Sequence, residues 1–446
     1  MALMVSVSGI RGIYGTDLNP ENIAKYSAAF GTWCKGGTVV VGRDSRTTGE
    51  VCEKIVSAAL QSVGCDVILT GIATTPTIAM AVLKHKAAGA IILSASHNPA
   101  EWNALKMLNS KSEFLDADEG AAVLKFAETD TIAYKTHEHL GSITVDHDAL
   151  DYHIQKILEL PYIDRNLIAS KKFKVVVDAV NGAGSESIPA LLEALGAGQV
   201  TKLHCTPNGL FPHNPEPLPE HLGDIINEMK TGKHDLGVVV DPDADRLALV
   251  DSGGRFFGEE YTQAAAFDFY LSKNKGDITT NLSSSMICDY IAKKHGVSCH
   301  RSAVGEINVV KKMRSTGSVI SGEGNGGVIN PDLHAGRDGL VGIAMILQHL
   351  AETGKTSAEY RSELPDYFIV KNKITTEGID KDAVLKRVTE SFEDYQPDLT
   401  DGVKINFENG WAHLRKSNTE PIIRLYTESD SPENAKEIAK NVKKVV

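Results

Sequence analysis

The stretch AGAIILSASHNPAEWNALKM, residues 88–107, begins as a buried strand and turns abruptly polar. Its apolar run, Ala90–Leu93, is typical of a strand buried on both faces. The following serines, histidine, asparagine and proline favour a turn rather than a continued strand. Open α/β sheets bind ligands at the carboxyl ends of their strands. We therefore expect Ser96 to present its hydroxyl at such an edge, although Ser-His-Asn-Pro alone is equally typical of an ordinary strand-ending turn.

Strand-like runs alternate with helical spacing on both sides of this stretch. A strand is predicted from Thr38, and the apolar residues within 49–64 recur at the spacing of a helix. The pattern returns from Lys174 and again, less regularly, from Asp277. Alternating strands and helices indicate mixed, mostly parallel sheets. The sequence therefore predicts three similar α/β units.

The last part of the chain has a different pattern. Short alternating strands begin near Asp366 and are flanked by two helical stretches, which is typical of a small α+β domain. Polar and glycine-containing runs mark the seams between the predicted domains. We predict four domains: domain I at residues 1–150, domain II at 151–254, domain III at 255–364 and domain IV at 365–446.

Composition and charge narrow the class of protein. A chain of 446 residues is too long for one ordinary core, and its formal charge of −12 disfavours binding to nucleic acid or acidic membranes. No apolar run reaches the roughly 20 residues that cross a bilayer, and the first residues do not resemble a secretory signal. The six cysteines show no CxxC spacing, which favours a reducing compartment. We expect a cytoplasmic protein.

A second polar loop, DPDADR at residues 241–246, follows the apolar run LGVVV. On a continuing strand, alternate side chains would lie about 6.5 Å apart, too far to share one ion. Pro242 instead favours a tight turn that gathers the carboxylates of Asp241, Asp243 and Asp245. Three hard oxygen ligands suit Mg²⁺. The alternative is an acidic loop relieved by Arg246.

A third loop, SGEGNGGVINP at residues 321–331, places one carboxylate and one amide among four glycines. Glu323 and Asn325 could bind the hydroxyls of a sugar, because the two side chains supply both acceptors and donors. Phosphate cradling is disfavoured since no GK[ST] sequence ends the loop. A plain surface loop is equally consistent with this composition.

A fourth loop, RKSNTEPIIR at residues 415–424, is rich in phosphate-binding groups. Two guanidinium forks, two hydroxyls and an amide match the needs of a phosphate monoester, although a basic hairpin tip is the alternative. The basic residue Arg11, in a short glycine-flanked turn, lies near the start of the first α/β unit, and Arg43 and Arg46 follow its first long strand. The candidate phosphate ligands are Arg415, Ser417, Asn418, Thr419 and Arg424.

Together, the four loops resemble those of the α-D-phosphohexomutase superfamily over the whole chain. The marks of that superfamily are a T/S-A-S-H-N-P serine loop, a D-x-D-x-D-R metal loop, a G-E-x-S/N-G sugar loop and an R-x-S-x-T-E-P phosphate loop. This sequence has all four in the same order. The resemblance implies a central cleft between the domains. It also implies that hexose 6-phosphate and hexose 1-phosphate are interconverted through a phosphoserine and a hexose 1,6-bisphosphate, which serves as intermediate and activator.

The resemblance also implies roles for particular residues. Ser96 would be the phosphoserine, His97 would shape its loop, and Lys106 would act as acid and base. One Mg²⁺ per chain would be held by Ser96, Asp241, Asp243 and Asp245, with Arg11 and Arg246 as further catalytic residues. Sugar hydroxyls would be bound by Glu323 and Asn325. The non-reacting phosphate would be bound by Arg415, Ser417, Asn418, Thr419 and Arg424.

Several positions depart from the usual pattern. Ala104 replaces a glycine, Asn325 a common serine, and Gly327 and Glu306 stand where many members have histidine. These changes leave proton transfer in that region open, with His334 as a possible substitute. The WNALK and GEGNGG forms favour the branch of archaeal-type phosphoglucosamine mutases, with phosphomannomutase or phosphoglucomutase as the alternative. No residue that reads carbon 2 of the sugar can be named.

Two other classes of function compete with this interpretation. A metal-dependent phosphohydrolase could also use a phosphoserine, but such enzymes usually need further metal ligands, including histidines. A hydrolase triad at Ser96 is disfavoured because no GxSxG elbow surrounds it. A catalytically silent sugar-phosphate sensor would not need the serine, the lysine and the aspartates together. The expected partners are small sugar phosphates, with no nucleic acid and no membrane, and both a monomer and a dimer are compatible with the sequence.

Overall fold

The computed structural model describes residues 3–6, 9–376, 378, 380–417 and 422–446. The chain forms two compact units. The first consists of Met1–Thr262 with Asn325–Arg361, and the second of Gln263–Gly324 with Ser362–Val446. The prediction of α/β units with mixed sheets and a C-terminal α+β domain is confirmed.

The first unit begins with a seven-stranded mixed sheet in the order β1-β2-β6-β5-β3-β4-β7. Neighbours from β5 to β7 are parallel, and neighbours from β1 to β5 are antiparallel. In the register of β5 and β6, Ile92 lies opposite Lys106. The returning strand β6 therefore carries Lys106 back beside the strand that leads to Ser96. The strands are β1 (Met4–Ser6), β2 (Gly9–Ile13), β3 (Val39–Arg43), β4 (Val67–Ile72), β5 (Gly89–Leu93), β6 (Trp102–Asn109) and β7 (Ile143–Val145).

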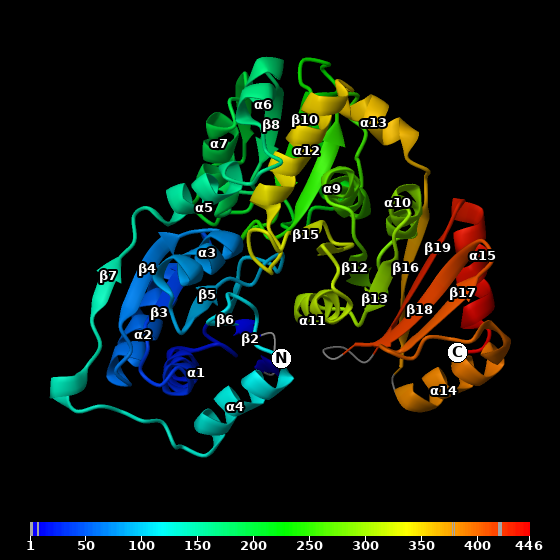
Figure 1. The fold of residues 1–446 in the computed structure, drawn as a ribbon. Helices are drawn as coiled ribbons and strands as arrows, with labels where there is room; N and C mark the ends of the chain where they lie inside the picture. The colour runs from blue at the N-terminus through cyan, green and yellow to red at the C-terminus, as the bar shows by residue number, and fades with distance from the viewer. Residues whose placement is uncertain (1–2, 7–8, 377, 379, 418–421) are drawn as a thin grey trace. The chain divides into compact units, whose positions relative to one another are not determined.

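Helices cover both faces of this sheet (Figure 1). Val39 and Val41 of β3 belong to a core that includes residues of α1, α2 and α4, whereas Val40 belongs to the core under α3 and α5. This split follows from the alternation of side chains along a strand, and it explains why the strand sequences are continuously apolar. The helices are α1 (Pro20–Trp33), α2 (Gly49–Ser62), α3 (Thr75–His85), α4 (Ala117–Glu128), α5 (Ala149–Leu158) and the short η1 (His137–His139).

A second sheet of the first unit has the order β11-β10-β8-β9, with β11 antiparallel and the others parallel. The strand β10 leads directly into the acidic loop. The helix α12 packs against α5, α6 and α7. The elements are α6 (Arg165–Lys171), β8 (Lys174–Asp178), α7 (Gly184–Ala194), β9 (Gln199–Leu203), η2 (Pro219–His221), α8 (Gly223–Met229), β10 (Leu236–Val240), β11 (Leu247–Asp251), β15 (Gly327–Ile329) and α12 (Gly339–Thr353); α13 (Ser357–Glu363) leads into the second unit.

Two helix starts in the first unit are capped by side chains. The Thr74 hydroxyl accepts a hydrogen bond from the amide of Thr77 at the start of α3. The Asp338 carboxylate accepts from the amides of Leu340 and Val341 at the start of α12. Caps of this kind satisfy amides that have no partner within the helix. They fix the positions at which α3 and α12 begin.

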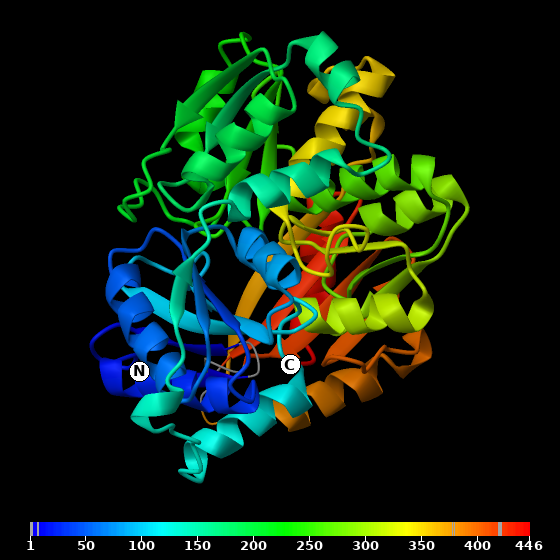
Figure 2. The same ribbon diagram turned by 60° about the vertical axis from the view of Figure 1, so that its left-hand side comes forward.

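The second unit contains three parallel strands and an antiparallel sheet. In the first group, β12 pairs with β13 and β14. The antiparallel sheet has the order β16-β19-β18-β17, and its core includes residues of α14 and α15. The sheet and these two helices are the orange and red elements of Figures 1 and 2. The elements are α9 (Glu259–Lys273, beginning in the first unit), β12 (Ile278–Asn281), α10 (Ile287–His295), β13 (Cys299–Ser302), α11 (Glu306–Thr316), β14 (Ile320–Glu323), β16 (Phe368–Thr375), α14 (Lys381–Ser391), η3 (Glu393–Tyr395), β17 (Val403–Phe407), β18 (Gly410–Lys416), β19 (Ile422–Ser429) and α15 (Pro432–Lys443).

Across the described ranges, none of the helices combines the length and apolar character that crossing a membrane requires.

Candidate active site

The serine loop follows β5 at the carboxyl edge of the first sheet, as the sequence predicts. Ser96 is buried and has a φ of 50°, in the left-handed region that residues with a Cβ seldom adopt. Its amide donates to the Ser94 hydroxyl at 2.9 Å, and the amide of Asn98 donates to the carbonyl of Ala95 at 3.1 Å. Strained backbone of this kind persists where the surroundings enforce it. The tight turn therefore fixes the direction of the Ser96 hydroxyl.

The guanidinium of Arg46 holds this loop from within the protein. Arg46 is 1% exposed, and its Nη2 donates to the carbonyls of Ser96 and Asn98 at 2.6 and 2.7 Å. Its Nη1 donates to the carbonyl of Pro99, and its Nε pairs with Asp44 at 3.0 Å. From the sequence alone, Arg46 is predicted only to be a basic residue after the first long strand. Its position directly after β3, matching that of Ser96 after β5, is the signal that could have identified it.

The acidic loop is a tight turn, in agreement with the prediction from Pro242. The amide of Ala244 donates to the carbonyl of Asp241 at 3.0 Å, and Ala244 has a φ of 54°. One oxygen from each of Asp241, Asp243 and Asp245 lies within 4.8 Å of the others, and all three residues are fully buried. The turn therefore gathers the three carboxylates that an extended strand would separate.

Each carboxylate has a different partner. The Ser96 hydroxyl donates to Asp241 Oδ2 at 2.6 Å, which joins the serine loop directly to the acidic loop. Lys106 Nζ donates to Asp243 Oδ2 at 2.6 Å and lies 3.9 Å from Asp245. The sequence therefore identified three groups that the fold does bring together: the serine, the lysine and the aspartates.

Two further contacts to the acidic loop come from residues that the sequence did not single out. Thr75 donates to Asp243 twice, from its hydroxyl to Oδ2 at 2.6 Å and from its amide to the carbonyl at 2.9 Å. Arg337 Nη2 donates to Asp245 Oδ2 at 2.6 Å. Thr75 stands in an apolar helix start that reads as core, so no pattern marked it. Arg337 lies in the segment DLHAGRDG, residues 332–339, and its only sequence signal is that it follows a polar turn.

The pKa values of Asp241 and Asp243 shift in opposite directions. Burial, together with the charges of Asp245 and Asp243, raises the pKa of Asp241 well above its ordinary value. Burial acts in the same direction on Asp243, but Lys106, Thr75 and Arg337 hold the pKa of that carboxyl well below its usual range. Asp241 is thus the carboxylate least neutralised by the protein itself.

The donor set fits a hard divalent cation. Asp243 Oδ1 and Asp245 Oδ1 are buried and make no hydrogen bond to any described residue. Buried carboxylate oxygens without partners are costly, and a cation beside them would also relieve the repulsion that raises the pKa of Asp241. Three carboxylates at one point are the oxygen ligands that Mg²⁺ uses, with its other positions left to water or phosphate.

Cations surround the serine. Arg11 Nη1 donates to Asn98 Oδ1 at 2.9 Å, and burial lowers its pKa from the ordinary value. The amide of Arg246 donates to Asp241 Oδ1 at 3.2 Å, and its Nε lies 3.9 Å from Asp241 Oδ2. Burial and the neighbouring cations lower the pKa of His97 to about 2, so this imidazole is neutral. Its Nδ1 lies 3.4 Å from the Ser96 hydroxyl. The surroundings of Ser96 therefore suit a multiply charged anion.

The two predicted sugar ligands belong to different units. Glu323, at the end of β14 in the second unit, is buried, and its Oε1 accepts from Asn281 Nδ2 and the amide of Gly305, both at 3.0 Å. Asn325 begins the later segment of the first unit, where its Oδ1 accepts from the amide of Gly327 at 3.3 Å.

The predicted phosphate loop lies in the second unit. Arg415 on β18 and Arg424 on β19 are direct partners in the antiparallel register. Arg415 Nε pairs with Asp401 Oδ2 at 2.7 Å, and the amide of Ser417 donates to the carbonyl of Ile422 at 3.0 Å. The two remaining predicted ligands, Asn418 and Thr419, lie outside the described residues.

The sequence left open a proton-transfer role for His334. The structure buries this side chain and places its Nε2 3.2 Å from Asp338 Oδ2. A buried imidazole bonded to a helix-capping carboxylate serves the local packing. The contacts of His334 are thus accounted for by packing, and its role in proton transfer stays a prediction.

The fold and the site define a class of protein, a multidomain α/β protein with a strained serine that hydrogen-bonds to a buried carboxylate triplet. Four models of the phosphoglucomutase/phosphomannomutase family match the chain in order: alpha/beta/alpha domain I at residues 3–133, domain II at 151–254, domain III at 258–368 and the C-terminal domain at 369–445. The chain belongs to this family. It is a phosphohexomutase, and hence an isomerase, and the predicted superfamily is confirmed.

Relatives match along the entire chain. A phosphoglucomutase/phosphomannomutase of Thermococcus kodakarensis is 37% identical over 98% of this chain and 97% of its own length. A phosphoglucosamine/phosphogalactosamine mutase of Sulfurisphaera tokodaii is 31% identical over 100% of this chain and 99% of its own. The crystal structure of a phosphoglucomutase/phosphomannomutase family protein from Burkholderia thailandensis is 25% identical, has a TM-score of 0.86, and is matched over 99% of this chain and 97% of its own.

Proposed function

We propose that the enzyme transfers a phosphoryl group between Ser96 and a hexose or hexosamine phosphate. The 6-phosphate and the 1-phosphate are interconverted through a 1,6-bisphosphate, which also restores the phosphoserine when it is lost. One observation carries this proposal: the Ser96 hydroxyl donates to Asp241 at 2.6 Å, within the buried carboxylate triplet. An ordinary strand-ending turn would not direct a strained serine into three buried carboxylates.

In the forward transfer, a hydroxyl oxygen of the sugar monophosphate bonds to the phosphorus of phosphorylated Ser96, and the bond from phosphorus to Ser96 Oγ breaks. The bisphosphate then turns over, and the second transfer returns the other phosphoryl group to Ser96. Lys106 carries the proton exchanged with the sugar oxygen, since it is buried and contacts Asp243 in the acidic loop. Arg11 and Arg246 neutralise charge on the transferred group, which is the main requirement of phosphoryl transfer.

Asp241, Asp243 and Asp245 would hold one Mg²⁺, with the phosphorylated Ser96 as a further ligand. When bound, the ion would neutralise phosphoryl oxygens and fix the group for in-line transfer. The unpartnered oxygens of Asp243 and Asp245 support this assignment.

The non-reacting phosphate would bind Arg415, Ser417 and Arg424, together with Asn418 and Thr419. The support is the direct pairing of Arg415 with Arg424 on neighbouring strands, since two guanidinium groups can share one phosphate dianion. Glu323 and Asn325 would bind sugar hydroxyls in either orientation of the bisphosphate.

For the substrate, we propose that glucosamine phosphates are turned over and that glucose and mannose phosphates also react. Side chains that bind the sugar in both orientations of the bisphosphate must contact hydroxyls that lie between the two phosphates. The substituent on carbon 2 should therefore have little effect on binding. Strong rejection of an analogue needs a buried partner that would be left unpaired. All six cysteines are free, which supports a reducing compartment such as the cytoplasm.

The test combines intact-protein mass with a mutase assay. Purified protein should carry a single phosphate adduct that glucosamine 1-phosphate or 6-phosphate removes. Values of kcat/KM for the 1-phosphates of glucosamine, glucose and mannose should lie within about a thousandfold of one another. Release of inorganic phosphate without the isomeric sugar phosphate would instead identify a phosphohydrolase, and the absence of any reaction with glucosamine phosphate would refute the substrate assignment.

A further inference from the structure

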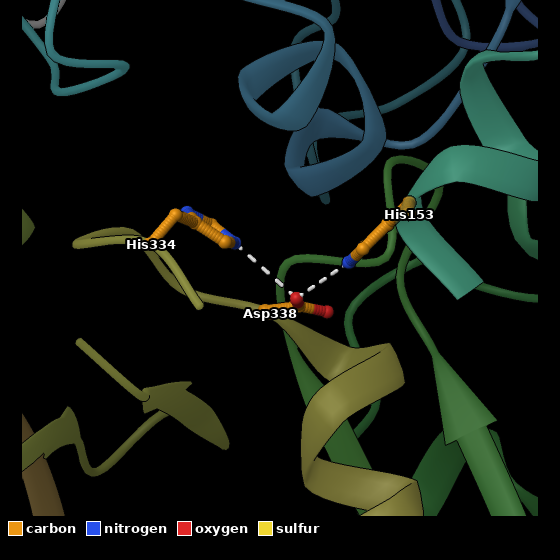
Figure 3. A group of neighbouring side chains, drawn as sticks. All are labelled: His153, His334 and Asp338. Carbon is orange, nitrogen blue, oxygen red and sulfur yellow. Dashed lines mark hydrogen bonds and ion pairs between the residues drawn. The ribbon is translucent and has the colours of Figure 1, made fainter. Parts of the chain in front are cut away.

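A buried group of two histidines and an aspartate, His153, His334 and Asp338, lies in the first unit (Figure 3). Asp338 Oδ2 is 2.9 Å from His153 Nε2 and 3.2 Å from His334 Nε2. The three side chains are at most 1% exposed. The other oxygen of Asp338 accepts from the first amides of α12, at 2.8 and 3.2 Å. Burial opposes ionisation of Asp338, but the two imidazoles hold its pKa well below the ordinary value.

His153 has a second partner that His334 lacks. Its Nδ1 lies 3.0 Å from the hydroxyl of Thr77, which in turn lies 2.7 Å from the hydroxyl of the α3 cap, Thr74. His334 Nδ1 makes no hydrogen bond within the described part of the chain. One imidazole on α5 therefore joins the start of α3 to the start of α12.

These two helix starts hydrogen-bond to the acidic loop from two sides, an arrangement called the clamp below. On one side, Thr75 donates to Asp243 from both its hydroxyl and its amide, at 2.6 and 2.9 Å. On the other side, Arg337 donates to Asp245 at 2.6 Å, and the amide of Gly339 donates to the carbonyl of Ala244 at 3.1 Å. His153 thus links the two sides of one clamp, although it touches none of the three aspartates.

The same three residues could be read as a cation site, since their ligand atoms lie close together. A tetrahedral zinc ion keeps its ligand atoms about 3.3 Å apart, as follows from bonds of roughly 2.0–2.1 Å. The 2.9 Å separation of His153 and Asp338 is that of a direct hydrogen bond. Both imidazoles can donate from Nε2, and His153 Nδ1 can then accept from Thr77. Hydrogen bonding accounts for the cluster without an ion.

We infer that His153 is a positioning residue that holds the acidic loop in the geometry needed to bind magnesium, an inference that rests on the proposed function of that loop. Groups that orient metal ligands from behind typically change metal affinity by about 10–100-fold when they are removed. His153 acts one step further back, through Thr77 and Asp338. Its loss should loosen both sides of the clamp and should weaken magnesium binding more than sugar binding.

Three variants, the bridge variants, interrupt the hydrogen-bonded link from Thr77 through His153 to Asp338. In His153→Gln, the amide can still donate to Asp338 but no longer reaches Thr77, and in His153→Asn the reverse holds. Thr77→Val removes the hydroxyl from the far side and keeps the shape of the side chain. The matched control, His334→Leu, removes a hydrogen bond to the same Asp338 oxygen without touching the link to α3. Magnesium binding to chelator-treated protein is measured by calorimetric titration, and the magnesium-induced rise in Tm is measured separately.

In each bridge variant we expect the Kd for magnesium to rise at least tenfold and the magnesium-induced rise in Tm to become much smaller. The kcat of these variants should recover at high magnesium. The control should stay within about threefold of the unaltered protein. Unchanged magnesium affinity in all three bridge variants, or equal weakening in the control, would overturn the inference while leaving the proposed function intact. An unaltered protein that binds no magnesium would overturn both. Stoichiometric zinc that is lost in the His153 and His334 variants alike would show a cation site instead.

Discussion

Replacing Asp241 with asparagine is expected to stabilise the magnesium-free protein and to abolish most of its response to magnesium. The other two carboxylates each have a cationic nitrogen at 2.6 Å, whereas the nearest cationic atom to Asp241 is Arg246 Nε at 3.9 Å. Burial and the neighbouring carboxylates raise the pKa of Asp241. The charge of Asp241 therefore opposes folding until a cation is bound.

The magnitude follows from the distances. Two like charges within 4.8 Å repel by about 3.5 kcal/mol at an effective dielectric constant near 20, and Asp241 has two such neighbours. Neutralising Asp241 also loses its attraction to Arg246, which is about 4 kcal/mol at the same dielectric constant. The hydrogen bonds from Ser96 and the Arg246 amide become weaker, which destabilises the folded state by roughly 1 kcal/mol more. The net gain in the free energy of unfolding is about 1–2 kcal/mol, which corresponds to a rise in Tm of about 1–3 °C for a unit of this size.

Magnesium should reverse this order. A ligand at a hundred times its Kd stabilises the folded state by about 2.7 kcal/mol, and each tenfold loss of affinity removes about 1.4 kcal/mol of that gain. The Tm of the Asp241→Asn variant should therefore be higher than that of the unaltered protein in a chelator. In excess magnesium its Tm should be lower than, or equal to, that of the unaltered protein. Scanning calorimetry in the two buffers measures both differences.

The matched control is Asp243→Asn, for which the opposite sign is expected. Lys106 and Thr75 hold the pKa of Asp243 low despite its burial, so its charge stabilises the fold above the ordinary aspartate pKa. Neutralising it leaves Lys106 buried without its partner, at a cost of about 3–5 kcal/mol. A loss of stability in both variants in the chelator would refute the assumption that the triplet is under mutual repulsion.

The dependence on pH adds a check on the sign. Because the folded-state pKa of Asp241 is raised, the folded protein binds its proton more tightly than the unfolded chain does. The destabilising charge appears only as the pH rises above the ordinary aspartate value of about 3.9. The advantage of Asp241→Asn should therefore shrink as the pH falls toward that value and grow toward neutrality. An advantage that is constant with pH would point to packing instead.

The remaining predictions concern transfer, phosphate binding and the loop support. Ser96→Ala should remove the phosphate adduct and all mutase activity while lowering Tm by only a few degrees, since one buried hydrogen bond to Asp241 is lost; intact mass and the coupled assay measure the first two effects, and activity near normal would refute the phosphoserine. Arg415→Ala should lower kcat/KM about ten- to hundredfold, since a charge-assisted bond is worth about 1.5–3 kcal/mol, whereas binding of an unphosphorylated sugar should not change; equal losses would indicate a misfolded domain. Arg46→Met should lower the free energy of unfolding by about 3–5 kcal/mol, because Asp44 and the loop carbonyls lose a buried partner; an unchanged Tm would contradict the role of Arg46.

The sequence predicted the fold class and the acidic turn because each rests on a local signal. Apolar runs such as the one before Ser96 mark buried strands, and Pro242 disfavours an extended conformation for the aspartates. The pairing of β5 with β6 was not predicted, although it explains why Lys106 follows Ser96 by ten residues. Strand pairing depends on which segments share a core, and that information is spread over the chain.

The supports of the site were missed for a related reason. Arg46 and Thr75 act through contacts with residues 50 and 168 positions away. Neither stands in a motif of its own, and a buried arginine reads in sequence as a solvated one. Only the fold shows that Arg46 is 1% exposed and bonded to the serine loop. Residues that hold a site are less visible in sequence than residues that react, since many side chains could supply the same support.

Gly327 illustrates how one position must be read with another. In the sequence it counts only as a departure, because many relatives of this motif form carry histidine there. A Cβ at Gly327 would lie 2.2 Å from Cδ of Arg337, whose guanidinium pairs with Asp245. A histidine at 327 and Arg337 in its present place therefore exclude each other. The glycine leaves the space through which Arg337 brings a cation to Asp245 of the acidic loop. The proton transfer proposed for Lys106 does not depend on a side chain at position 327, since Lys106 reaches the acidic loop from β6.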